Sequence, residues 1–424
     1  QHIWLKAAKL NKLDISITGP VPQLSIFTFN NKNPLETKTL FIQEMLNRKF
    51  ITTTAFYPSF SHNNRHIKKY EAAINEVFDI ISKELPGFTV IYCSKKESNR
   101  AWSLQDNAHK HHYLVENAKE NPDGYNYSHL NFDIWTVLNE LKPEVVITTG
   151  FYGTQMIAFF WALTHRSRRV VMTDGWRGSE AHLSALHRFV RKLVFKLSTA
   201  FIGASQGSKE LYLSYGIDPK AIFNSVLPVY AEISVLPAVR AMDQREYDLL
   251  FVGRLEEPKD PMFFLATCEA LAKSLNKNLN IRVVGEGSLF ERMKERSVGI
   301  PQLNVHFDGF VAPDRMDAIY SSAKILLFPT HIDAWGMVIA EALKNGTPVI
   351  ISDKTAAAYD LVENNINGFI MTEFTIETWS QRAQSMLENA STWHKYSAVA
   401  QLSILPYSYE AASRGILGAI EHVR

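Results

Sequence analysis

Two carboxylates and two cations in the second half of the chain stand out by their spacing. Asp333 and Glu341 lie eight positions apart in the stretch DAWGMVIAEALKNGTPVI, on either side of a Trp-Gly step and an apolar run. Arg254 and Lys259 lie five positions apart, just after the apolar stretch YDLLFV. Paired cations at the end of a strand can bind a diphosphate, and carboxylates can accept hydrogen bonds from sugar hydroxyls. Two solvated surface cations would fit the same basic pair.

Gly336 lies between the two acids and permits a tight turn into a helix, which we expect to begin near Met337. The first N–H groups of a helix lack intrahelical partners and attract anions. Eight helical residues rise about 12 Å, comparable with the span from the sugar to the ribose of a nucleotide sugar. We therefore expect Asp333 to accept hydrogen bonds from sugar hydroxyls and Glu341 to accept them from ribose hydroxyls. The diphosphate would lie over the start of the helix. Alternatively, Asp333 favours the helix dipole and Glu341 pairs on the helix surface.

A Gly-x-Gly step ends another apolar run, in the stretch VVGEGSL. Glycine lets a ligand come close to the backbone, so Gly285 and its neighbour Glu286 could contact one. A lone Gly-x-Gly step also fits an ordinary turn.

Short apolar strands alternate with helices in two successive regions of the chain. This alternation predicts an α/β protein with two Rossmann-like, doubly wound domains that face each other across a cleft. Ligands of such sheets bind at the carboxyl ends of the strands, where the residues above are expected. The expected strands are 88–94, 144–150, 168–175 and 199–205, then 247–254, 280–287, 303–310, 324–330 and 347–353, and the expected helices are 133–141, 154–164 and 182–197, then 261–275, 289–295 and 314–323.

The motifs VGRLEEPKD, VVGEGSL, HFDGFV and LLFPTHIDAWGMVIAEALKNGTPVI follow one another across residues 247–371. In order and spacing they closely resemble the nucleotide-binding half of GT-B-fold retaining glycosyltransferases of family 4. The resemblance implies that Glu341 binds ribose, that Asp333 contacts the donor sugar and that Arg254 and Lys259 hold the diphosphate. The first acid of the family motif is usually Glu, so the shorter Asp333 leaves donor preference open.

The resemblance also implies a mechanism and a wider set of residues. Retaining transfer in this family is thought to proceed on one face of the sugar, with the departing diphosphate oxygen helping to deprotonate the acceptor hydroxyl. The donor would be a UDP-, GDP- or ADP-sugar, and no metal or other cofactor is expected. The implied donor-binding residues are Gly253, Gly285, Glu286, Gly309, Phe310, Val311, Trp335, Gly336, Met337, Val338 and Glu341, and the expected catalytic residues are Asp333, Arg254, Lys259 and Asp174.

The region 86–235 resembles the acceptor-binding GT-B domain more loosely. The stretch MTDGWRGSEAH follows a predicted strand, so Asp174, Trp176 and His182, together with Gly153, are candidates for the acceptor side. Asp174 could instead cap a helix, and His182 could be an ordinary surface histidine. We expect a donor domain over 236–372 and C-terminal helices over 373–424 that close back on the acceptor domain.

The predicted helix LHRFVRKLVFKLS carries several basic residues among apolar ones. It could lie on an anionic bilayer surface that presents a lipid-linked acceptor. A packed helix with a solvated basic face fits the same pattern. Its basic side chains are His187, Arg188, Arg191, Lys192 and Lys196.

Residues 1–85 resemble a different family, the C-terminal subdomain of class III PLP-dependent aminotransferases of the glutamate-1-semialdehyde aminomutase type. That family's Schiff-base lysine and cofactor loops lie upstream of the resembling part, so we expect no PLP chemistry here. We expect an aminotransferase–glycosyltransferase fusion with an α+β N-terminal appendage. The first strand and loop usual for a GT-B domain are not evident between the predicted helix 64–85 and the strand at 88–94.

Composition excludes several other classes of protein. The net charge of +2 gives no global field for nucleic acid. Cys93 and Cys268 form no Cys-x-x-Cys pair, which fits a reducing cytosol, and the tract HKHH (109–112) is expected on the surface rather than on a metal. No apolar run reaches the roughly 18 residues that span a bilayer. We therefore expect a cytoplasmic protein, or one peripheral to the inner membrane.

The resulting hypothesis is an enzyme that transfers a hexosyl or N-acetylhexosaminyl group in bacterial surface polysaccharide or lipopolysaccharide synthesis. A catalytically impaired or truncated GT-B module, which binds nucleotide or a partner without turnover, remains the alternative. Another GT-B enzyme, such as a phosphorylase or a sugar-nucleotide epimerase, is a third.

Overall fold

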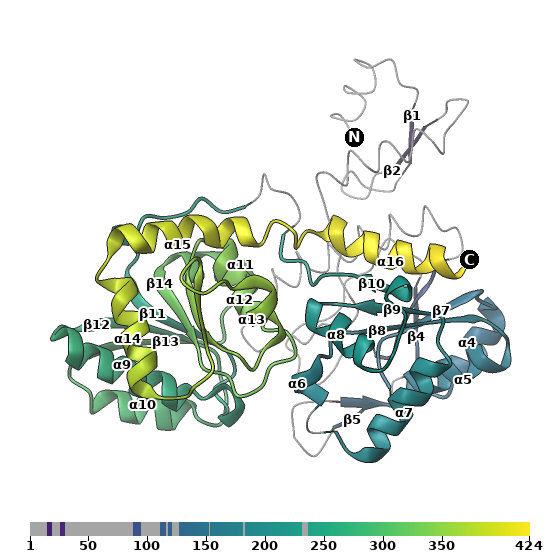
Figure 1. Ribbon diagram of the computed structural model, residues 1–424, viewed down its shortest axis with the longest axis horizontal. Helices are drawn as coiled ribbons and strands as arrows, with labels where there is room; N and C mark the ends of the chain where they lie inside the picture. Colours follow the sequence, from purple (N-terminus) through teal and green to yellow (C-terminus); the bar gives the residue numbers. More distant parts are fainter. Residues whose placement is uncertain are drawn as a thin grey trace.

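The computed structural model describes two α/β domains and their connections (Figure 1). Most of residues 1–87 lies outside the described residues, so the aminotransferase-like segment stays a prediction, and His182 also lies outside them. The structure describes residues 15–18, 26–29, 88–94, 111–115, 118–120, 127–151, 153–180, 183–230 and 236–424.

The first domain is built on a four-stranded parallel sheet in the order β10-β9-β8-β7. The four residues of β9 and the last four of β8 are buried, as expected of the middle of a sheet that is covered on both faces. The strands are β7 (Val145–Thr148), β8 (Arg168–Thr173), β9 (Ala200–Gly203) and β10 (Ile222–Asn224), and the helices are α4 (Ile134–Leu141), α5 (Thr154–Thr164), α6 (Arg177–Glu180), α7 (Ala185–Lys196) and α8 (Gln206–Ser214).

Two details of this domain differ from the sequence-based expectation. The strand expected at 88–94 forms β3 (Val90–Tyr92), but it pairs with β4 (His111–Tyr113) in a separate two-stranded sheet. An apolar run predicts that a segment forms a strand, but it does not predict which other strand pairs with it. The sequence pattern therefore could not reveal that β3 pairs with β4. The helix expected at 182–197 begins later, because Ser184 accepts a hydrogen bond from the His187 N–H and caps α7.

Four further described segments are short strands outside the main sheets. They do not contribute to the site described below. They are β5 (Ala118–Glu120), paired antiparallel with β6 (Tyr127–His129), and the antiparallel hairpin of β1 (Ile15–Thr18) and β2 (Ile26–Phe29).

The second domain contains a six-stranded parallel sheet in the order β13-β12-β11-β14-β15-β16. Helices separate successive strands, which makes the domain doubly wound as the alternation predicts. The strands are β11 (Tyr247–Val252), β12 (Leu279–Val284), β13 (Leu303–Gly309), β14 (Ala323–Phe328), β15 (Val349–Ser352) and β16 (Gly368–Met371), and the helices are α9 (Pro261–Leu275), α10 (Phe290–Val298), α11 (Pro313–Ser321), α12 (Met337–Lys344) and α13 (Ala356–Leu361).

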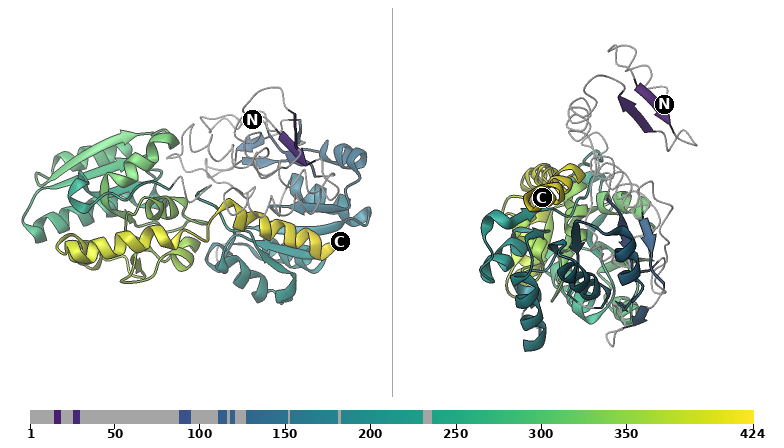
Figure 2. Two further views of the ribbon diagram at one scale, coloured as in Figure 1. Left: turned by 90° about the horizontal axis from the view of Figure 1, so that it is seen from above. Right: turned by 90° about the vertical axis from the view of Figure 1, so that its right-hand side faces the viewer.

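The last three helices connect the domains. α14 (Ile376–Leu387) packs on α9 and α15 (Ala390–Ser403) on α12, whereas α16 (Tyr409–Val423) crosses to β8, β9 and β10 of the first domain. Figure 1 and the left view of Figure 2 show α16, in yellow, lying along the first domain. Gly415 makes this approach possible, because a Cβ there would lie 2.0 Å from the Asn224 carbonyl oxygen.

The apolar core is continuous between the domains. Val170 and Ile202 of the first sheet belong to the same buried cluster as Leu326 of the second sheet and Ile416 of α16. Hydrogen bonds add to this contact: the Gln206 N–H, at the start of α8, donates to Asp360 Oδ2 of α13 at 3.0 Å. The carboxyl ends of the two sheets are therefore held close together.

Candidate functional site

The residues with predicted chemistry gather where four neighbouring strands of the second sheet end. Gly253 and Arg254 follow β11, and Gly285 and Glu286 follow β12. Gly309 ends β13, and the loop after β14 leads to Asp333. Because these strands are parallel neighbours, their carboxyl ends meet at one edge of the sheet.

The glycines bring three of these loops into close backbone contact. The Gly253 N–H donates to the Val284 carbonyl at 3.0 Å, and the Gly285 N–H donates to the Gly309 carbonyl at 2.8 Å. Gly285 has a φ of +135°, and a Cβ there would lie 1.9 Å from the Gly253 carbonyl oxygen. Only glycine fits this position, so the Gly-x-Gly step is needed for the packing of the loops themselves.

Glu256 ties the loops after β11 and β12 together. It is buried, and its two carboxylate oxygens accept hydrogen bonds from the N–H and the hydroxyl of Ser288, at 2.9 and 2.5 Å. The exposed Glu286 joins the loops after β12 and β13, because its Oε1 accepts a hydrogen bond from the Phe310 N–H at 3.3 Å. Sequence reasoning missed Glu256, since the motif LEEP does not show which of its two acids turns inward.

Lys259 and Asp333 form an ion pair in the centre of this edge. Lys259 Nζ lies 2.6 Å from Asp333 Oδ2, and it also donates to the Ile332 carbonyl at 3.1 Å. The exposed fractions of the two side chains are only 12% and 23%, so solvent screens the pair weakly. The structure thus brings one predicted cation to one predicted acid, while Arg254 lies at the end of β11 on the same edge of the sheet.

The loop before α12 orients Asp333. The Trp335 N–H donates to Asp333 Oδ1 at 3.2 Å, and the Asp333 N–H donates to the Lys354 carbonyl at 3.0 Å. The Trp335 side chain is buried and its ring lies beside that of Tyr407, and a role for Trp335 at the donor stays a prediction. The side chains of Val338 and Val311 are likewise buried in the core, because burial of apolar area favours it.

Helix α12 begins at Met337, where the sequence predicts it, with Gly336 as its N-cap. Gly336 has a φ of +96°, and a Cβ there would lie 2.6 Å from Thr355 Oγ1. Asp333 is therefore in a loop rather than on the helix. The assumption of eight helical residues between the acids is wrong, because the helix covers only the four steps from Met337 to Glu341, a rise of about 6 Å.

Glu341 is buried, and Tyr320 holds one of its oxygens. The Tyr320 hydroxyl donates to Glu341 Oε2 at 2.7 Å, and the Tyr320 side chain is fully buried. Burial and the Glu341 carboxylate raise the pKa of Tyr320 well above its usual value, so the phenol stays a donor. A solvated Glu pairing on the helix surface does not fit this arrangement. Sequence reasoning missed Tyr320, which the segment AIYSSAKILLF offered only as one more core aromatic.

Two residues of the first domain reach the same place. Asp174 follows β8; burial raises its pKa to about 6, with a further rise from Asp333 and a lowering by Arg191. The Trp176 Nε1–H donates to the Asp333 carbonyl oxygen at 3.4 Å. The structure therefore places these two predicted acceptor-side residues beside the Lys259–Asp333 pair.

Gly153 occupies a different part of the first domain. It is the N-cap of α5 with a φ of +55°, and a Cβ there would lie 1.9 Å from the His129 carbonyl oxygen. Its contact is thus with the end of β6, and a role for it at an acceptor stays a prediction.

The described residues show neither a metal site nor a membrane-spanning helix. Among these residues, no group of three or more His, Cys, Asp and Glu side chains could hold a metal ion. His111 and His112 belong to β4, where the His111 ring contacts Tyr92. Within the same described part of the chain, the helices are too short or too polar to cross a bilayer.

Comparison with known proteins identifies the part of the chain that carries most of this site. Residues 234–402 match the family described as Glycosyl transferases group 1. A Campylobacter jejuni protein is 26% identical over 243 residues, which cover 57% of this chain and 64% of that protein. Its name is GalNAc-alpha-(1->4)-GalNAc-alpha-(1->3)-diNAcBac-PP-undecaprenol alpha-1,4-N-acetyl-D-galactosaminyltransferase. The alignments span between 24% and 64% of the length of the curated relatives.

Solved structures with the same fold have low sequence identity to this chain. The lipopolysaccharide outer core galactosyltransferase WaaB, in its apo form, has a TM-score of 0.60 at 18% identity, and the similarity covers 83% of this chain and 95% of that one. Anabaena Alr3699/HepE in complex with UDP and glucose has a TM-score of 0.57 at 14% identity, over 74% and 86% of the two chains. The family match over residues 234–402 and the shared two-domain architecture together support a group 1 glycosyltransferase region built on the GT-B fold.

Proposed function

We propose that the chain is a retaining glycosyltransferase of family 4, which moves a sugar from a nucleotide-sugar donor to an acceptor. The observation that carries this proposal is the Lys259–Asp333 pair at the carboxyl edge of the second sheet, with Asp174 and Trp176 of the first domain beside it. A donor-side cation and acid thus lie close to an acceptor-side carboxylate, an arrangement that supports the binding of two substrates.

The donor would lie along the carboxyl edge of the second sheet. Lys259, Arg254 and the free N–H groups at the start of α12 would bind the diphosphate. Lys259 has three N–H donors, so it can bind a phosphate oxygen while keeping one hydrogen bond to Asp333. Asp333 would accept hydrogen bonds from sugar hydroxyls and Glu341 from the ribose hydroxyls. The backbone of Gly309, Phe310 and Val311 would lie beside the nucleobase.

The reaction breaks the bond between the sugar's anomeric carbon and a phosphate oxygen. The acceptor oxygen bonds to the same face of that carbon, and its proton passes to the departing phosphate oxygen. This chain's cations stabilise the negative charge that develops on the leaving group. Asp174, with a pKa of about 6, is largely ionised at neutral pH and would orient the acceptor hydroxyl.

The relatives favour a role in the synthesis of surface polysaccharide or lipopolysaccharide. The Campylobacter jejuni relative carries undecaprenol in its name, and WaaB is a lipopolysaccharide outer core galactosyltransferase. We accordingly propose a hexosyl or N-acetylhexosaminyl donor and a saccharide or lipid-linked acceptor. The enzyme would be cytoplasmic and would bind the acceptor at the inner membrane surface. UDP is the first nucleotide to test, because HepE was solved with UDP.

Calorimetric titration with UDP, GDP and ADP, followed by their hexose and N-acetylhexosamine conjugates, tests the donor. We expect one nucleotide to bind, and its sugar to be released with the anomeric configuration retained, which NMR of the product reads directly. Failure of all three nucleotides to bind would refute the proposal. An inverted product would leave transfer standing and refute the retaining mechanism.

A non-catalytic nucleotide-binding module is the second candidate. It is favoured by the shorter acid Asp333 and by the separation of β3 from the four-stranded sheet of the first domain. Tight nucleotide binding without transfer or hydrolysis of any bound sugar would support this candidate over the enzyme.

A further inference from the structure

Helix α7 presents a stripe of apolar side chains to solvent. Leu186, Phe189 and Leu193 have exposed fractions of 69%, 65% and 42%. Their spacing of three and four positions places them on one face of the helix. Val194 and Phe195 on the opposite side are buried in the first domain. The helix thus has an apolar face that the domain covers and a second one that no described part of the chain covers.

A row of cations runs beside this stripe. Arg188, Lys192 and Lys196 are exposed and lie four positions apart, so they follow one another along the helix. Arg191 differs, because it points inward to an ion pair with Glu180 and stacks over the Phe151 ring. The outer surface of α7 therefore combines apolar and basic side chains, whereas its inner surface packs against the rest of the first domain.

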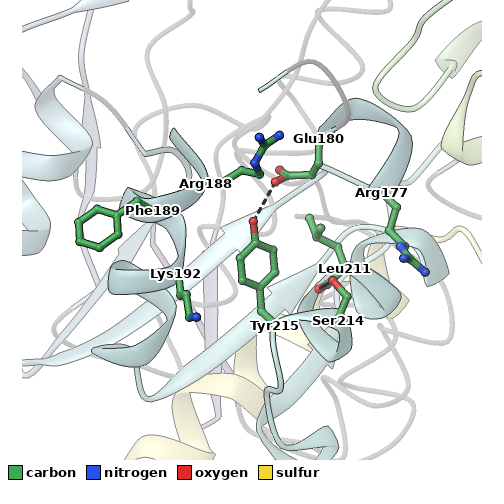
Figure 3. A pocket seen from close by; sticks show the side chains of 8 residues that line it. All are labelled: Arg177, Glu180, Arg188, Phe189, Lys192, Leu211, Ser214 and Tyr215. Atoms are coloured by element: carbon green, nitrogen blue, oxygen red, sulfur yellow. Dashed lines mark hydrogen bonds between the residues drawn. The ribbon is translucent and has the colours of Figure 1, made fainter. Parts of the chain in front are cut away.

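An open groove of about 400 Å³ adjoins the same cations (Figure 3). It lies between α6, α7 and α8, and Arg177, Arg188 and Lys192 line it together with Phe189. The acid in its wall is already satisfied, since Glu180 pairs with Arg191 and accepts a hydrogen bond from the Tyr215 hydroxyl at 3.2 Å. The groove therefore has an excess of positive charge next to an exposed aromatic ring.

We propose that the α7 surface, formed by Leu186, Phe189, Leu193, Arg188, Lys192 and Lys196, docks on an anionic phospholipid bilayer. Apolar side chains of an interfacial helix enter the boundary between headgroups and acyl chains, and flanking cations pair with anionic headgroups. The groove takes one such headgroup. Charge complementarity selects this occupant, because a purely apolar partner would leave the row of cations without counter-charges.

The docking surface connects to the site through Arg191. Its guanidinium lies on the inner side of α7, pairs with Glu180 and acts electrostatically on Asp174. Docking through α7 would bring Asp174 near the bilayer, where a lipid-linked acceptor is available. This last step rests on the proposed function, whereas the docking itself does not.

Co-sedimentation with vesicles tests the docking. We expect the full chain to bind vesicles of phosphatidylcholine mixed with phosphatidylglycerol at least about tenfold more tightly than phosphatidylcholine alone, and to lose most of this preference at high salt. Replacing Leu186 and Phe189 by Ser, or Arg188 and Lys192 by Glu, should abolish binding to the anionic vesicles.

Matched controls are available on the second domain. Val298 and Leu402 are exposed apolar residues, and Lys277 and Lys395 are exposed cations. Their Ser and Glu variants make the same chemical changes and should leave vesicle binding intact. Circular dichroism and nucleotide titration of every variant verify the fold and the donor site.

Equal binding to neutral vesicles, or full binding by the α7 variants, would overturn the docking. Displacement by inorganic phosphate at matched ionic strength would show that the groove binds free anions instead. A dimer in solution that the α7 variants dissociate would identify a second copy of the chain as the occupant. Vesicle binding by a chain that binds no nucleotide would uphold the docking and refute the proposed function.

Discussion

Lys259 and Asp333, 74 positions apart in the chain, meet as an ion pair with 2.6 Å between Nζ and Oδ2. The cation proposed for the diphosphate is thus already neutralised by the acid proposed for the sugar. Donor binding must redistribute these hydrogen bonds. The same pair of side chains would then contact both the diphosphate and the sugar of the donor.

Asp333→Asn should separate binding from turnover. The neutral amide leaves Lys259 free for the diphosphate, so nucleotide affinity should hold or rise, while loss of the sugar contact should lower kcat by about a hundredfold. Steady-state kinetics together with calorimetry measure both quantities. An equal loss of kcat and affinity would argue against the sugar contact, and Glu373→Gln, at an exposed acid, serves as the control.

Glu341→Ala should abolish nucleotide binding without unfolding the domain. The change removes the proposed ribose contact and leaves the Tyr320 hydroxyl without its carboxylate partner, at a cost of about 1–3 kcal/mol in the free energy of unfolding. Calorimetric titration and urea denaturation report the two effects. A folded variant with unchanged nucleotide affinity would refute the ribose role.

Tyr320→Phe should weaken nucleotide binding through Glu341. The ring still fills the core, so the free energy of unfolding should fall by only about 1 kcal/mol, whereas Glu341 loses the donor that orients it. We expect a higher KM for the donor and a nearly unchanged kcat. Tyr212→Phe is the matched control, because this buried hydroxyl donates to the Val171 and Ile202 carbonyls of the first domain. If both variants change the donor KM alike, Tyr320 has no specific role in positioning Glu341.

Asp174 should make the protein less stable as the pH rises. Its folded pKa, about 6, lies above its ordinary value of 3.8, so between these values the folded state keeps a proton that the unfolded state has lost. The free energy of unfolding therefore decreases as the pH rises from about 4 to about 6. Above that range the contribution of Asp174 to it no longer changes. Asp174→Asn should remove this part of the pH dependence, as urea denaturation at pH 4.5 and pH 7.5 would show. Parallel pH profiles for the variant and the parent would contradict the shift.

Gly285→Ala should disrupt the loops that hold the donor. The new Cβ would overlap the Gly253 carbonyl oxygen, and the residue's φ of +135° is unfavourable for alanine. Gly216→Ala is the control, since φ there is also positive, at +79°, but the Cβ would meet open space. We expect a loss of about 1 kcal/mol at Gly216 and several times more at Gly285, in thermal denaturation. Similar losses would mean that the loops can move apart.

The sequence determined the local elements of the second domain and the types of its functional residues. The spans expected for β11 and α9 and the start of α12 agree with the structure, because continuous apolar runs, Pro261 and Gly336 act through local geometry. The motifs likewise indicated which cations and acids to examine, since their chemistry belongs to the residues themselves.

Only the tertiary structure decided which of those residues meet. β3 reads as a strand in the sequence but lies outside the four-stranded sheet, because pairing depends on distant segments. Trp335 is turned into the core, and Glu341 is bonded to a tyrosine that no motif singled out. The Lys259–Asp333 pair and the approach of Trp176 arise from strand order and from the packing of the two domains. Periodicity and local spacing carry no information about contacts between residues so far apart in the chain.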